Sequence, residues 1–127
     1  MSDGTFPEFH LQFGTVIKLA DDLPEVIPAD GNLVTVPMVE EYIEFVNQEF
    51  TTPFRVLVNR KFSYTYDFDA QLLLSEMDHI RATAVLLYSK AAQVATDSMA
   101  LFPREQEWKM QTFDDRDKAL AWLNDLD

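Results

Sequence analysis

The chain has 127 residues, and this length suits one domain with a buried core, so we expect a single domain over residues 1–127. Apolar residues make up 47% of it, and the absence of cysteine excludes disulfides, thiolate metal sites and cysteine nucleophiles. Ten Lys and Arg oppose 22 Asp and Glu, for a formal net charge of −12. Because this charge repels phosphate groups, we expect neither nucleic acid nor an anionic membrane surface as a partner.

The expected location is the cytoplasm of a bacterial-type cell. The segment Met1–Gly4 lacks the basic region and apolar run of a signal peptide. No stretch approaches the roughly 20 apolar residues that a membrane-spanning helix needs.

The first quarter of the chain predicts two or three antiparallel strands. Apolar residues alternate over 9–13, which is the period of a half-buried strand, and extended character continues over 16–19. A turn is expected at 21–24, a short strand at 25–27 and a second turn at 29–32.

From Thr35 the apolar period changes to steps of three and four residues. This pattern predicts a helix that begins near Pro37 in its first turn and ends before Pro53. The segment Phe54–Val58 is apolar nearly throughout and predicts a central strand. A polar and aromatic loop, Asn59–Tyr66, follows, and Asp67 is expected to cap the next helix.

The last third of the chain repeats this alternation. Ala82–Tyr88 predicts a buried strand, and Ser89 is expected to cap a helix that Pro103 ends. Trp108–Phe113 predicts the last strand. Asp114 is expected to cap a final helix, in which apolar residues recur with helical spacing.

The predicted order is β-hairpin-α-β-α-β-α-β-α. Strands that alternate with helices need crossover connections, so the predicted fold class is α/β, with a mainly parallel sheet and helices packed on it.

No catalytic, metal or cofactor constellation is visible. His10 and His79 have no second ligand at metal spacing, so we interpret both as surface residues. The acidic segments at 21–22 and 114–117 lack the spacing of a calcium loop. The three glycines are too scattered for a phosphate loop.

One segment is a candidate site. The loop Asn59–Tyr66 follows a central strand, and ligands in open α/β sheets bind at the carboxyl ends of strands. The residues after the next strand should lie at the same edge. The alternative is a loop whose aromatic rings cover the core and whose hydroxyls satisfy backbone groups. The candidate ligand- or partner-binding residues are Asn59, Arg60, Lys61, Ser63, Tyr64, Tyr66, Ser89 and Lys90.

Read in this order, the chain resembles the bacterial SpoIIAA-like group, which shares the STAS fold and is sometimes compared with CRAL-TRIO lipid-transfer domains. The resemblance covers most of the chain from about residue 30 onward. It rests on Pro53–Asn59 leading into Ser63–Tyr66, on Ala82–Tyr88, and on the ending Phe113–Leu123.

This resemblance implies a mixed sheet of four or five strands backed by helices, with no enzymatic activity of its own. Anti-sigma-factor antagonists with this fold are switched by phosphorylation of a serine in a loop after a central strand. Their Asp-Ser-Ser-Gly-like loop has no match here, and the corresponding region reads Asn59–Ser63. Ser63 is the candidate phosphoacceptor if the switch is present.

The leading hypothesis is a non-catalytic interaction or regulatory domain that binds a protein partner or a second copy of itself as a homodimer. An aromatic-rich chain without visible chemistry favours it, because aromatic side chains often anchor interfaces. The alternative is a carrier or sensor of a small amphipathic ligand such as a fatty acid, since ten Phe and five Met could line an apolar pocket as well as a core. An enzyme would require titratable groups clustered near Tyr64, Tyr66 and Lys90.

Overall fold

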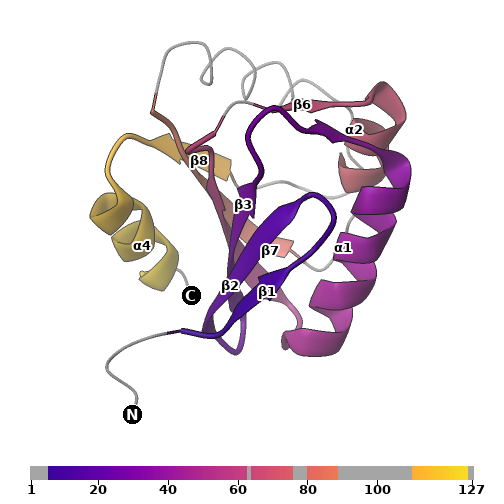
Figure 1. The fold of residues 1–127 in the computed structure, drawn as a ribbon. Coiled ribbons are helices and arrows are strands. Elements are labelled where there is room, and N and C mark those ends of the chain that lie inside the picture. Colours follow the sequence, from indigo (N-terminus) through magenta and orange to yellow (C-terminus); the bar gives the residue numbers. More distant parts are fainter. Residues whose placement is uncertain (1–5, 63, 76–79, 89–109, 126–127) are drawn as a thin grey trace.

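The computed structural model describes residues 6–62, 64–75, 80–88 and 110–125. Over these residues the chain forms three layers, with α1 and α2 on one face of a six-stranded sheet and α4 on the other (Figure 1). The elements are β1 (Glu8–His10), β2 (Gly14–Ala20), β3 (Leu23–Pro28), β4 (Leu33–Val34), α1 (Val36–Glu49), β5 (Phe54–Asn59), β6 (Thr65–Tyr66), α2 (Phe68–Ser75), β7 (Ile80–Leu86), β8 (Met110–Phe113) and α4 (Arg116–Asn124).

The first three strands are antiparallel, as expected, but their boundaries differ from the prediction. β1 ends at His10 because Leu11 and Gly14 exchange backbone hydrogen bonds of 2.8 and 3.3 Å and close a tight turn. Gly14 lies so close to β3 that a Cβ on it would come within 2.3 Å of the Ile27 carbonyl oxygen. Pro24 belongs to β3 and not to the preceding turn.

The main sheet has six strands in the order β1-β2-β3-β5-β7-β8, and not four or five. β3, β5, β7 and β8 run parallel, as the alternation of strands and helices predicted. β7 spans Ile80–Leu86, two residues earlier than expected. A second, two-stranded parallel sheet joins β4 to β6 and was not predicted.

The helices α1 and α2 were expected, and α4 begins one residue later than the sequence suggested. Its N-cap is Asp115, whose carboxylate accepts hydrogen bonds from the Asp117 and Lys118 amides, so the assignment of the cap to Asp114 was wrong. The helix predicted after Ser89 lies outside the described residues.

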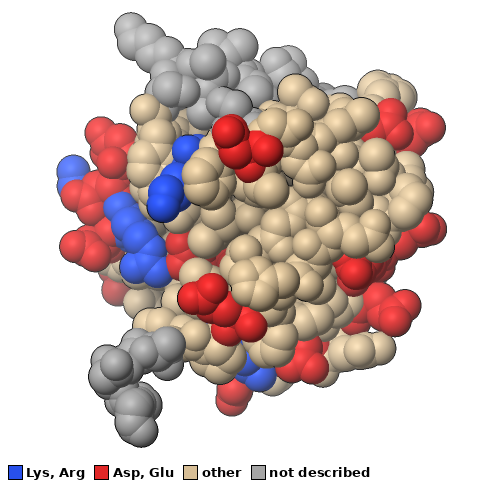
Figure 2. Space-filling view, in the orientation of Figure 1, with Lys and Arg blue, Asp and Glu red and all other residues tan. Residues whose placement is uncertain are grey.

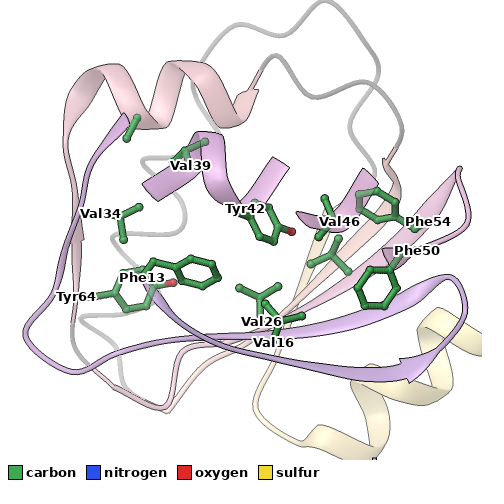
Figure 3. Close-up of a cluster of buried hydrophobic side chains, with 12 residues drawn as sticks. Phe13, Val16, Val26, Val34, Val39, Tyr42, Val46, Phe50, Phe54 and Tyr64 are labelled. Carbon is green, nitrogen blue, oxygen red and sulfur yellow. The ribbon is translucent and has the colours of Figure 1, made fainter. Parts of the chain in front are cut away.

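Apolar side chains form a core on each face of the sheet. The larger one lies between the sheet, α1 and α2, and includes Phe13, Tyr42 and Tyr64 (Figure 3). The smaller one lies under α4, where Leu57 meets Leu123. The segments that follow the parallel strands therefore lie at an edge of the sheet that borders both cores.

Candidate site at the carboxyl edge of the sheet

Parallel pairing brings the ends of β5 and β7 to one edge of the sheet. Asn59 is opposite Leu86, and the Arg60 amide donates to the Leu86 carbonyl over 3.0 Å. Tyr88 follows two residues later, so it lies at the same edge as the loop after β5. Ser89 and Lys90 come next in the chain but lie outside the described residues, as does Ser63.

The alternation of β5 separates two of the predicted site residues. Successive side chains of a strand point to opposite faces. Leu57 belongs to the core under α4, so Asn59 points to that face, while Val56 and Val58 face the core under α1 and α2. Arg60 lies on this second face, over the ring of the core residue Tyr64. Asn59 and Arg60 are both buried. They therefore belong to two separate groups of side chains.

Asn59 belongs to a buried polar cluster that the sequence did not reveal. Its side-chain amide donates to Glu25 Oε2 over 2.9 Å, and Arg116 Nη2 donates to Glu25 Oε1 over 2.6 Å. Glu25 is only 2% exposed, and its hydrogen bond raises the pKa of the Arg116 guanidinium above its usual range. The cluster joins β3, β5 and the first residue of α4. A charged residue within an otherwise apolar strand was the one available signal for it.

Arg60, Tyr64 and Tyr66 form the second group, on the face of α1 and α2. The Arg60 guanidinium carbon lies 4.5 Å from the centre of the Tyr64 ring, and the rings of Tyr64 and Tyr66 are 5.4 Å apart. Tyr64 is part of the core, and Tyr66 packs against it. Burial raises the pKa of both phenols, so they remain protonated near neutral pH and cannot act as bases there.

The segment that follows the loop is hydrogen-bonded to the backbone of β4 and of the residue before it. The Thr65 amide donates to the Asn32 carbonyl over 3.0 Å, and the Asp67 amide donates to the Val34 carbonyl over 2.9 Å. These bonds hold the N-terminal ends of α1 and α2 side by side.

Large apolar side chains are exposed along this edge. Of the five that the described residues contain, Phe6 precedes β1, and the other four lie on segments at the carboxyl ends of the parallel strands. Lys61 lies beside them, with its Nζ 5.5 Å from the centre of the Phe62 ring. We call these four residues the carboxyl rim: Leu33 at 51% exposed, Phe62 at 40%, Phe68 at 62% and Tyr88 at 58%.

Within the described residues, no group of three or more His, Asp or Glu side chains is placed to hold a metal ion. His10 is exposed and lies 3.4 Å from the Thr15 hydroxyl, while His79 falls outside the described part of the chain. None of the helices that the structure describes has the length and apolar character needed to cross a bilayer.

The geometry defines a mixed α/β protein with a SpoIIAA-like fold. A comparison of structures supports this assignment: the chain is similar to an uncharacterised protein of the DUF3478 family, with a SpoIIAA-like fold, from Shewanella loihica PV-4. The TM-score is 0.50 at 14% sequence identity, and the match covers 97% of this chain and 98% of that one. No protein-family sequence profile matches the chain, and no curated protein matches it.

Proposed function

We propose that this protein is a non-catalytic interaction domain that binds a protein partner, or a second copy of itself, through the carboxyl rim. The observation that carries the proposal is the gathering of four exposed large apolar side chains at one edge of the fold. Each exposed ring or branched side chain keeps apolar area in contact with water, and covering it on binding releases roughly 25 cal/mol per Å².

The two buried groups support a binding function over a catalytic one. The Glu25 carboxylate is already bound by Asn59 and Arg116, and the Tyr64 and Tyr66 phenols are held protonated by burial. These titratable groups stabilise the edge and leave its apolar side chains to make contacts.

The test compares the wild-type protein with a rim variant, Leu33→Ser, Phe68→Ser and Tyr88→Ser combined. Phe6→Ser is the matched control, because Phe6 is 48% exposed but precedes β1, away from the rim. Crosslinking in the native host and analytical ultracentrifugation would measure partner binding and self-association.

We expect the wild type and Phe6→Ser to form the same complex. The affinity of the rim variant for this complex should be at least tenfold lower. A wild-type protein that is strictly monomeric and crosslinks to no partner would contradict the proposal. So would a rim variant that associates as well as the control.

A further inference from the structure

Two residues of the carboxyl rim lie on neighbouring segments. Leu33 lies in β4, and Phe68 is the first residue of α2. The pairing of β4 with β6 and the hydrogen bond from the Asp67 amide to the Val34 carbonyl hold these segments together. We call Leu33 and Phe68 the apolar corner, and both are more than half exposed.

The charged residues on the two segments that carry the apolar corner are all acidic. Asp30, Asp67 and Asp69 are exposed on the two segments that carry it, and neither 29–35 nor 64–72 contains a Lys or Arg. Figure 2 shows a broad uncharged area on the face that carries the β1–β2 hairpin and α1, bordered mostly by acidic side chains, with a few basic side chains at its left. An apolar contact flanked by carboxylates attracts a partner with positive charge beside its own apolar residues.

We propose that the apolar corner binds a cationic amphipathic segment of a protein partner; this inference rests on the proposed function and specifies its partner. Such a segment places apolar side chains on Leu33 and Phe68 and Lys or Arg side chains beside the three aspartates, as amphipathic helices do in apolar grooves. A second copy of this chain is disfavoured, because it carries a net charge of −12 and would bring carboxylates together.

The test measures binding of two synthetic probes to the full chain by isothermal titration calorimetry. One probe is an amphipathic helical peptide of Leu and Lys, and the other has Glu in place of every Lys. Each is titrated into the wild type at about 0.1 M and about 1 M salt, where exposed charges are screened at roughly 10 and 3 Å. Three variants complete the set: Leu33→Ser with Phe68→Ser, Asp67→Asn with Asp69→Asn, and Phe6→Ser as control.

We expect the Lys peptide to bind the wild type and Phe6→Ser equally, at least tenfold more tightly than the Glu peptide. Both corner variants should bind the Lys peptide at least tenfold more weakly than the wild type does. High salt should weaken binding of the Lys peptide to the wild type. Asparagine keeps the helix-capping ability of aspartate, so the Asp67→Asn and Asp69→Asn pair tests charge without disturbing α2.

Equal binding of the two peptides, or equal loss in Phe6→Ser, would overturn the inference. If the Lys peptide fails to bind while the rim variant still loses its native complex, the rim binds a partner of different charge, and only this inference fails. If the rim variant keeps its native complex, the proposed function fails as well.

Discussion

Of the charged residues that the structure describes, Glu25 is the most deeply buried. An ionised carboxylate is rarely buried without partners, because its desolvation costs several kcal/mol. Arg116 and Asn59 supply these partners, and the side chain of Arg116 is itself 43% exposed. The pair is therefore asymmetric: the arginine can turn to water when its partner is lost, and the glutamate cannot.

This asymmetry predicts that Arg116→Met destabilises the protein by about 3 kcal/mol, because it leaves a buried carboxylate without its cation. Glu25→Gln should cost only about 1 kcal/mol, since the amide can still accept a hydrogen bond. Urea unfolding at neutral pH measures both values. Lys118→Met is the control, because it removes a cation from the same helical turn without touching Glu25, and it should have almost no effect.

Tyr64 allows a second prediction at the residue scale. Its hydroxyl makes no hydrogen bond shorter than 3.5 Å within the described structure, so Tyr64→Phe should change stability near pH 7 by less than about 1 kcal/mol. Burial raises the pKa of this phenol in the folded state, and therefore the wild type loses stability as the pH rises above about 10, where the unfolded chain ionises. Tyr64→Phe removes that contribution.

Urea unfolding between neutral pH and about pH 11 would measure this difference. The stability of Tyr64→Phe should fall less steeply, by up to about 1.4 kcal/mol per pH unit for the missing proton. Identical alkaline slopes in the two proteins would mean that Tyr64 ionises as readily when folded as when unfolded.

At the scale of elements, two-residue strands and close backbone contacts account for what the sequence did not reveal. β4 and β6 are too short to show any alternation, so no pattern could predict that they pair. The turn before β2 likewise depends on one glycine, which has the Ile27 carbonyl where a side chain would be.

We therefore expect Gly14→Ala to destabilise the hairpin by about 3 kcal/mol, because the added methyl group meets backbone atoms that cannot move aside. Gly31→Ala is the matched control. Gly31 has a φ of +73°, but no atom lies within 4 Å of the place that a Cβ would take, so alanine there should cost only about 1 kcal/mol of backbone strain. Thermal unfolding of both variants checks the ranking, and an equal loss of stability would contradict it.

For the whole molecule, local periodicity predicted the α/β class, the opening antiparallel strands and the parallel strands that follow. It could not predict contacts between residues far apart in the chain. Glu25 and Arg116 are separated by 91 positions, and nothing near either residue indicates the other. The same limit applies to the site: Asn59 and Arg60 are adjacent in the sequence, yet Asn59 binds Glu25 while Arg60 lies over the Tyr64 ring on the other face of the sheet.

The two ends of the described chain lie together, away from the carboxyl rim (Figure 1). Arg55, near the start of β5, donates to the Leu123 carbonyl over 2.9 Å, and this contact places the end of α4 beside the amino ends of the parallel strands. The Lys18 amide donates to the Pro7 carbonyl, and Lys18 is paired with Pro24 near the start of β3, so the described chain enters near the same end. A fluorophore attached at Phe6 or Asp125 would leave the apolar side chains of the rim open to solution, and protein immobilised through either position would present that edge outward.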